Sequence, residues 1–297
     1  MSLQVDLTYT PVVNFAMQQN HAPVIRGIKV LNEGEVPIGD VHVHVAFEPA
    51  FALEFDTLLE RIDPGCEETI DVVPISCSTA FLSNLTERVL GAMTVTLRTE
   101  DELLFEKAYE ISVLAFNEWG GVDVLPEMLA AFSTPNHPEV TRLIKKASDV
   151  LGRWTDSPAL DEYQTRDPNR VKMQMAALYE AISSEGIAYA SVPASFESSG
   201  QRIRLVDEVV GGKLGNCLDM SMLYVSCLEA MGLHPVVVLT KGHAFAGCWL
   251  VKDTFADSVN DDPSLLTKRI AEGINEMLVV ESTCMNASSR ATFDDSG

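Results

Sequence analysis

The chain has 297 residues, enough for two domains that each hold a hydrophobic core. Hydrophobic residues make up 46% and charged residues 22%, an ordinary balance for a globular protein, but the formal net charge is −22. Nucleic-acid binding needs clustered Lys and Arg, so this charge argues against direct binding of DNA or RNA. The same charge disfavours anionic membranes.

Targeting and redox signals point to the cytoplasm. The sequence contains no apolar run of the ~18 residues that a membrane helix needs. Its start, "MSLQVDLTYT", lacks the basic and apolar regions of a signal peptide. The six cysteines form no CxxC pair, so we expect free thiols in a reducing compartment. We expect no cofactor and no metal site.

Residues 1–116 predict strands. Segments such as "IRGIKVLNE", "VHVHVAFE" and "AMTVTLRTE" alternate apolar and polar residues, and turn signals such as "DPGCEE" separate them. Short antiparallel strands with no strong helix predict an immunoglobulin-like β-sandwich. The stretch "STAFLSNLTERVLG" fits a helical turn or a loop. His42 and His44 share one face of a strand, where solvation or pairing is favoured over metal binding.

The stretch "FNEWGG", residues 116–121, marks a boundary, and residues 117–297 predict an α+β domain. Helical spacing appears in "PEVTRLIKKASDVLGRW", which Pro138 can begin, and in "NRVKMQMAALYEAISSEG", which Gly186 can close. Residues 187–215 are mostly irregular, and a loop of that length is often functional. Residues 253–275 predict an insertion with a short helix, and "EMLVVEST" predicts a last strand.

Cys217 lies at the start of a predicted helix in "GNCLDMSMLYVSCLEAMG". Asn216 is a candidate N-cap, Gly232 a candidate C-terminal glycine, and an apolar stripe runs between them. The free N–H groups and the dipole of the first turn favour a thiolate, and they can also stabilise an oxyanion. Asp219 opposes the thiolate electrostatically while helping to cap the helix. The alternative is that Cys217 is a small buried residue.

His243 opens a predicted strand in "TKGHAFAGCWLV", 26 residues after Cys217. A histidine at that position can reach a thiol on a neighbouring helix and act as its base. We therefore expect the two side chains to face each other within a few ångströms. The alternative is a surface histidine with ordinary polar partners.

The order of these residues resembles a known superfamily. "GNCLDMSMLYVSCLEAMGLHPVVVL", "GHAFAGCWLV" and "VVEST" look like the core of the transglutaminase-like cysteine hydrolases, with their papain-like α+β fold. The resemblance implies Cys217 as nucleophile, His243 as base and Glu281 as the acid that orients the imidazole. Glu281 and Ser282 stand where the family usually has Asp and Pro. Asp253 is the alternative acid.

A second resemblance covers nearly the whole chain. "NEWGG", "PEMLAAFSTPNHPEV", "PASFESSGQRIRL" and "GHAFAGCWL" are similar to the N-terminal region of large bacterial superfamily 1 DNA helicase-like proteins. There, a β-sandwich and a transglutaminase-like domain precede the motor. The chain stops at "RATFDDSG" without a Walker A motif, so it resembles a fragment or a short relative. A helicase module is thus an implied partner in a full-length protein.

Further side chains are candidates for the same site. Gln201 in "SSGQRIRL" can complete an oxyanion hole with the Cys217 amide. Arg202 and Arg204 can pair with Asp219 or with a substrate carboxylate. Trp119 and Trp249 can line a cleft, although packing is the favoured role for both.

Two functions remain open from the sequence. The favoured one is a cysteine peptidase or amide hydrolase acting on a peptide or protein with a Cys-His-Glu triad. The alternative is an inactive interaction module that keeps the fold and docks a partner or the helicase portion.

Overall fold

The protein has a mixed α+β fold, described here by a computed structural model of residues 3–191 and 194–297. The chain divides into two compact units, residues 1–120 and residues 121–297. Each unit has a hydrophobic core built from its own residues.

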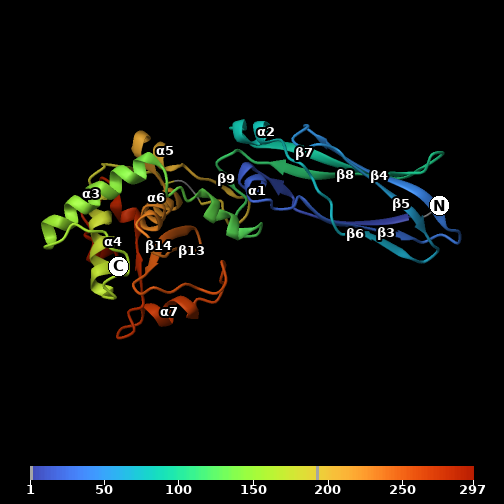
Figure 1. Cartoon of the computed structure of the whole chain (residues 1–297). Coiled ribbons are helices and arrows are strands. Elements are labelled where there is room, and N and C mark those ends of the chain that lie inside the picture. Colours follow the sequence, from blue (N-terminus) through green and yellow to red (C-terminus); the bar gives the residue numbers. More distant parts are fainter. Residues whose placement is uncertain (1–2, 192–193) are drawn as a thin grey trace. The chain divides into compact units, whose positions relative to one another are not determined.

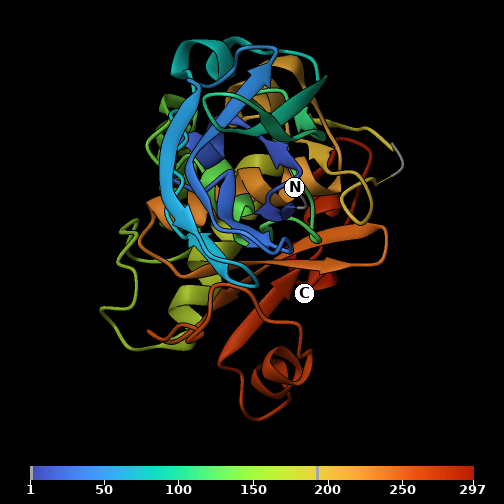
Figure 2. The same cartoon turned by 90° about the vertical axis from the view of Figure 1, so that its right-hand side faces the viewer.

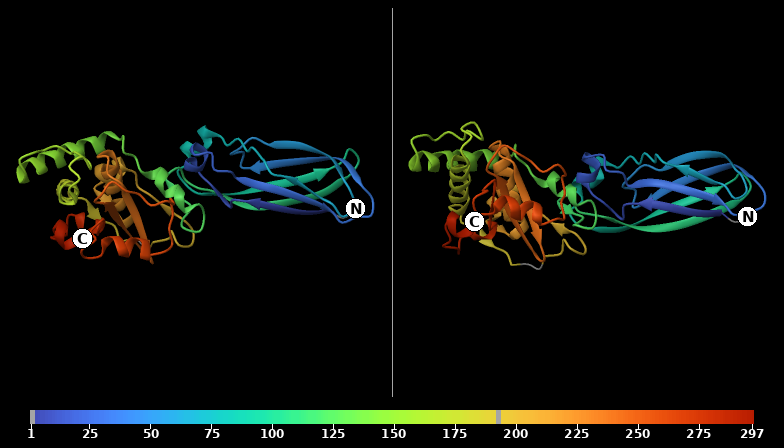
Figure 3. Two further views of the ribbon diagram at one scale, coloured as in Figure 1. Left: turned by 60° about the horizontal axis from the view of Figure 1, so that its bottom comes forward. Right: turned by 90° about the horizontal axis from the view of Figure 1, so that it is seen from below.

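The first unit is a β-sandwich-like arrangement of two sheets (Figures 1 and 3). The smaller sheet has the order β1-β3-β6, with strands β1 (Leu3–Tyr9), β3 (Ile25–Asn32) and β6 (Glu67–Ile70). The larger sheet has the order β2-β8-β7-β4-β5, with strands β2 (Val12–Val13), β8 (Leu103–Val113), β7 (Val89–Arg98), β4 (Ile38–Glu48) and β5 (Phe55–Ile62).

The alternating sequence pattern explains the core of this unit. Successive side chains of a strand point to opposite faces, so every second residue can be buried. In β4 and β7 the pairs Val43–Leu97 and Val45–Val95 lie opposite each other and are fully buried. Buried residues of β3 join the same core from the other sheet.

Two details of the first unit add to the expectation of antiparallel strands with no strong helix. Strand β2 is only two residues long and pairs in parallel with the end of β8. Two short helices also occur, α1 (Phe15–Gln19) and α2 (Thr79–Asn84), capped by Asn14 and Ser78. Helix α2 is the helical turn that was one of the two alternatives for its stretch. Strand β9 (Glu118–Trp119) follows near the end of the unit.

His44 has a carboxylate partner on the neighbouring strand. Its Nδ1 lies 2.8 Å from Asp56 Oδ1, across the β4–β5 pair. In the part of the chain that the structure describes, no group of three metal-binding side chains occurs. His44 is therefore paired, which is one of the two roles that the sequence favoured for this face.

The second unit packs helices against a three-stranded antiparallel sheet (Figure 1). The sheet has the order β13-β14-β15, from β13 (Pro235–Thr240), β14 (His243–Trp249) and β15 (Met277–Val280). The main helices are α3 (Pro138–Trp154), α4 (Pro168–Ser183), α5 (Val206–Gly212) and α6 (Cys217–Ala230). Shorter elements are η1 (Pro126–Phe132), β10 (Ala188–Tyr189), β11 (Gln201–Arg202), β12 (Leu214–Gly215), α7 (Ser264–Ile270), η2 (Ser282–Met285) and α8 (Phe293–Ser296).

Helix α6 is the central helix of this unit. It packs against β13 and β14 on one side and against α3 and α4 on another. The predicted apolar stripe is too narrow, because nearly all of its residues are buried, as in a helix enclosed by a core. Ser221 and Ser226 are tolerated inside because each hydroxyl donates to the carbonyl four residues earlier.

Local signals set the helix boundaries, and those at Pro138 and Gly232 were predicted from the sequence. Pro138 and Pro168 begin α3 and α4, where a missing N–H costs nothing. Gly232, with φ of +76°, follows the C-cap of α6. Helix α7 forms inside the insertion and packs beside β15 (Figure 2).

None of the helices in residues 3–191 and 194–297 has the length and apolar character that crossing a membrane requires.

Candidate active site

Cys217 is the first residue of α6, as the sequence predicted, and a reciprocal cap fixes the start of this helix. The side chain of Asn216 accepts from the Asp219 amide at 3.0 Å, and Asp219 Oδ2 accepts from the Asn216 amide at 2.9 Å. The thiol therefore lies at the positive end of a well-defined helix. Only 6% of Cys217 is exposed.

Asp219 also ties the preceding loop to this helix. Its carboxylate is fully buried and accepts from the Arg204 amide and from Arg204 Nη1, both at 2.8 Å. The predicted pairing of Arg204 with Asp219 is therefore present. Since Asp219 is neutralised by this partner, the carboxylate acts as an anchor for residues near Gln201.

His243 and Glu281 form the central pair of the site. His243 begins β14, and Glu281 directly follows β15, the neighbouring antiparallel strand. His243 Nε2 lies 2.7 Å from Glu281 Oε2. Because α6 packs against β14, Cys217 and His243 begin two adjacent elements of one core.

Glu281 has a second set of partners on its other oxygen. Oε1 accepts from the Thr283 amide at 3.0 Å and from the Thr283 hydroxyl at 2.7 Å. Burial opposes ionisation of Glu281, but the hydrogen bonds from His243 and Thr283 outweigh it and lower the pKa of this carboxyl. Glu281 is therefore held as a carboxylate beside the imidazole.

Asp253, the alternative acid, lies in a different environment. Its backbone carbonyl contacts His234 Nδ1 at 2.7 Å, and its carboxylate accepts from the Thr254 amide. His243 begins strand β14 and Trp249 ends it, so Asp253 lies beyond the end of the strand that is farther from His243. The geometry places Glu281, rather than Asp253, against His243.

Tyr189 is a residue of the site that the sequence did not single out. Strand β10 pairs in parallel with β12, which sets Tyr189 opposite Gly215, two residues before Cys217. Burial raises the pKa of Tyr189, and the charges of Cys217 and Glu281 raise it further. The only signal in the sequence was the length of the irregular segment 187–215.

Two further polar contacts were not predicted. Thr283 belongs to the "EST" stretch, where only the acid had been assigned a role. Glu197 Oε1 accepts from the Gly242 amide at 2.6 Å, next to His243. This contact ties the 194–200 segment to the turn that precedes β14.

Of the remaining candidates, Arg202 is exposed, whereas Gln201, Trp119 and Trp249 are buried. Gln201 is buried, and its Oε1 accepts from the Ser195 amide at 3.2 Å, so its role towards the thiol stays a prediction. Trp119 and Trp249 are both buried, which fits packing rather than lining an open cleft. Trp249 packs on Phe255, and the Arg269 guanidinium lies 5.1 Å from the centre of each ring.

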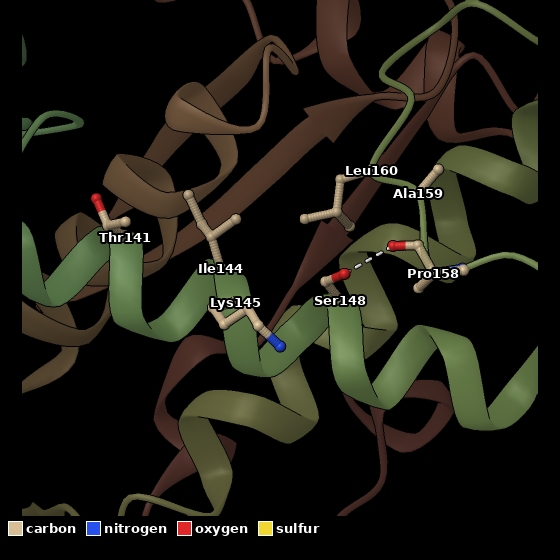
Figure 4. A pocket seen from close by; sticks show the side chains of 7 residues that line it. All are labelled: Thr141, Ile144, Lys145, Ser148, Pro158, Ala159 and Leu160. Atoms are coloured by element: carbon tan, nitrogen blue, oxygen red, sulfur yellow. Dashed lines mark hydrogen bonds between the residues drawn. The ribbon is translucent and has the colours of Figure 1, made fainter.

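A hollow on the surface of this unit lies away from these residues. Figure 4 shows a shallow, largely apolar hollow of about 480 Å³ between α3 and residues 158–160. Ile144 and Leu160 point into it, and Ser148 donates to the Pro158 carbonyl at its rim. None of the residues that line it belongs to the Cys217, His243 and Glu281 group.

Comparison with known proteins leaves the family open. No family model and no curated protein matches the chain. One similar solved structure is the CsuC–CsuE chaperone–tip adhesion subunit complex of Csu pili of Acinetobacter baumannii, at 13% identity and a TM-score of 0.19. That match covers 39% of this chain and 57% of the other.

A second similar structure is a family 76 glycoside hydrolase from a bovine Bacteroides thetaiotaomicron strain. It is 11% identical with a TM-score of 0.18, and the match covers 77% of this chain and 49% of the other. The chain thus spans about half the length of these two solved chains. At such TM-scores neither likeness bears on function.

Proposed function

We propose that residues 121–297 form a transglutaminase-like cysteine hydrolase that cleaves amide bonds in a peptide or protein. Cys217 is the nucleophile, His243 the base and Glu281 the residue that orients the imidazole. The observation that carries the proposal is the 2.7 Å contact between His243 Nε2 and Glu281 Oε2 beside the helix that Cys217 begins.

The tautomer of His243 follows from this contact. A carboxylate can only accept, so Nε2 carries the proton and Nδ1 keeps its lone pair. Nδ1 is then the nitrogen that can take the proton of the Cys217 thiol. The negative charge of Glu281 stabilises the imidazolium that results.

The reaction proceeds in two steps. The thiolate attacks the amide carbonyl, and the oxyanion forms near the N–H groups of the first turn of α6, with Gln201 as a second candidate donor. The C–N bond breaks as His243 returns its proton to the amine, leaving a thioester on Cys217. Water, deprotonated by His243, then attacks the thioester and releases the carboxylic acid and the thiol.

Hydrolysis is preferred over transfer to an amine because water is the default acceptor. The proposal extends to the whole protein through the sequence resemblance. It assigns residues 1–120 to an immunoglobulin-like sandwich, the protein to the cytoplasm of a bacterium, and a helicase-like module to the full-length chain.

The burial of the thiol favours the second candidate function. With only 6% of Cys217 exposed, the path of a substrate carbonyl to this residue is narrow in this conformation. An interaction module that keeps the fold without turnover needs no such path. The two functions differ in whether the thiol reacts faster than an ordinary cysteine.

A digestion experiment tests hydrolysis. The protein is incubated with a complex peptide mixture in H₂¹⁸O, and new C-termini carrying ¹⁸O are identified by mass spectrometry. We expect labelled products from the native chain and from Cys227→Ala, and none from Cys217→Ala. Cys227 is a matched control because it is buried in the same helix. Equal products from both variants would assign any cleavage to a contaminant and reject the proposal.

A further inference from the structure

The main chain of Glu281 is held in place as well as its carboxylate. Strand β15 ends at Val280, and the amide of Glu281 donates to the carbonyl of Ser296 at 2.7 Å. Ser296 is the last residue of α8. Because a shift of the main chain would move the carboxylate relative to His243, the position of Glu281 depends on the position of α8.

Helix α8 is short and is closed by its own hydrogen bonds. The amide and the hydroxyl of Thr292 donate to Asp295 Oδ2 at 2.8 Å and 2.7 Å, and the Ser296 hydroxyl donates to the Thr292 carbonyl at 2.9 Å. A helix of four residues is too short to be stable alone in water. The place of α8 must therefore come from its packing on the rest of the unit.

Tyr179 of α4 supplies this packing at both ends of α8. Its ring meets the ring of Phe293, the first residue of α8, edge to face with 5.7 Å between the centroids. Its hydroxyl hydrogen-bonds with the hydroxyl of Ser296, the last residue, at 2.8 Å. All three side chains are buried: Tyr179 is 2% exposed, and Phe293 and Ser296 are 8% exposed.

We propose that Tyr179 is a positioning residue for Glu281. It holds α8 so that the Ser296 carbonyl keeps the main chain of Glu281, and with it the carboxylate, against His243. Tyr179 acts through Ser296 and Glu281 and not on the reacting atoms. This role rests on the assignment of Glu281 as the acid of the proposed hydrolase, but its test needs no turnover.

The test follows the side-chain carboxyl carbon of Glu281 by ¹³C NMR as the pH is lowered, and Glu281→Gln assigns the signal. Against the effect of burial, the hydrogen bonds from His243 and Thr283 lower the pKa of Glu281 below its ordinary value of 4.5. A carboxylate that moves away from these donors loses that effect. The pKa of Glu281 therefore reports how well the carboxylate is placed.

Tyr179→Phe removes the hydroxyl that reaches Ser296 and keeps the ring. We expect the pKa of Glu281 to rise towards 4.5 in this variant. Phe293→Ala removes the ring contact between α8 and Tyr179 and should raise the pKa further, whereas Phe293→Leu, which keeps an apolar side chain there, should raise it less.

Tyr224→Phe is the matched control. Tyr224 is fully buried in the same core as Tyr179, and its hydroxyl donates to the Met175 carbonyl at 2.9 Å. Loss of this hydroxyl should destabilise the unit about as much as Tyr179→Phe, but it should leave the pKa of Glu281 at the native value. Urea unfolding at pH 7 measures the stability of each variant and shows that it is folded.

Three results would overturn the positioning role. The pKa of Glu281 could be unchanged in Tyr179→Phe, it could rise equally in Tyr224→Phe, or it could equal 4.5 in the native protein. The proposed hydrolase is judged separately by its ¹⁸O-labelled products. A rise in Tyr179→Phe in a protein that yields no such products would keep the positioning of Glu281 and reject the hydrolase.

Discussion

The carboxylate of Glu281 has two sets of donors, one on each oxygen. Oε2 contacts His243, and Oε1 accepts from Thr283. The hydrogen bond that holds the ring of His243 in place is therefore made with a carboxylate that Thr283 itself holds in position. We expect that removing the charge of Glu281 and removing the hydroxyl of Thr283 change the reactivity of Cys217 by different amounts.

Glu281→Gln keeps the shape of the acid but removes its charge. We expect the rate of Cys217-dependent hydrolysis to fall about 10²–10⁴-fold, because the imidazolium loses its stabilising charge. Asp253→Asn is the control and should change the rate by less than about twofold, since its contacts are with His234 and Thr254. A large loss in Asp253→Asn alone would make the assignment of the acid wrong.

Thr283→Val removes the hydroxyl that donates to Glu281. The pKa of Glu281 is lowered in the folded protein, so its hydrogen bonds stabilise the fold above the ordinary value of 4.5 and this contribution is lost as pH falls through the lowered value. We expect a loss of about 1 kcal/mol at pH 7 that shrinks on acidification. Urea unfolding at several pH values measures it, and Thr283→Ser should restore the native curve. A loss that is the same at pH 7 and pH 3 would contradict this role.

Helix α6 shows at the scale of an element what the sequence could predict. The sequence predicted the start of α6 at Cys217 and its caps at Asn216 and Gly232, because helix caps depend on residues that are neighbours in the chain. The complete burial of α6 was not, because it depends on α3, α4 and the sheet, which meet only in the fold. The sequence did not predict that Tyr189 belongs to the site for the same reason, because a two-residue parallel strand pair is too short to leave a periodic pattern.

Asp219 is the anchor between α6 and the 201–204 segment. Asp219→Asn replaces the oxygen that accepts from Asn216 and Arg204 by an NH₂ group, which cannot accept, and it leaves Arg204 without its counter-charge. We expect a loss of about 2–4 kcal/mol in the free energy of unfolding. Asp207→Asn, an exposed change in the first turn of α5, should cost less than about 0.5 kcal/mol. Similar losses in the two variants would contradict the anchor.

Glu185 joins two helices through three cations. Its side chain, 7% exposed, accepts from Arg142 and Lys146 of α3 and from Lys213 after α5. The hydrogen bond from Arg142, followed by those from Lys146 and Lys213, outweighs burial and lowers the pKa of Glu185 to about 2.

Glu185→Gln should therefore destabilise the unit at neutral pH. Since the cations are partly exposed and screened by water, we expect about 1–2 kcal/mol rather than the full value of the shift. The folded pKa is about 2 and the ordinary value is 4.5, so the difference between native and variant should shrink between about pH 5 and pH 2. Thermal unfolding across this range measures it, and a difference that grows on acidification would contradict the arrangement.

At the scale of the whole molecule, each unit has a core of its own. The change of period near residue 116 was visible in the sequence because strands and helices bury residues at different spacings. The parallel pairing of β2 with β8 was not visible, because a two-residue strand is too short to show alternation.

Separate cores predict separate effects of core substitutions. Leu97→Ala in the first unit and Leu223→Ala in α6 both remove a buried side chain and should each cost about 2–5 kcal/mol. We expect only Leu223→Ala to change the alkylation rate of Cys217. Differential scanning calorimetry with site-resolved alkylation measures both, and an equal change of the rate in Leu97→Ala would contradict independent units.

The most direct test of the central claim, that Cys217 and His243 form a reactive pair, is the alkylation rate of Cys217 by iodoacetamide as a function of pH. The exposed Cys66 of the same chain is alkylated in the same sample for comparison. We predict that Cys217 reacts at pH 6 at a rate close to its value at pH 8, whereas a cysteine in a model peptide, with a pKa of about 8.5, slows about 100-fold over the same range. His243→Asn should abolish this advantage. A Cys217 profile that parallels that of Cys66, or that is unchanged in His243→Asn, would contradict the catalytic pair.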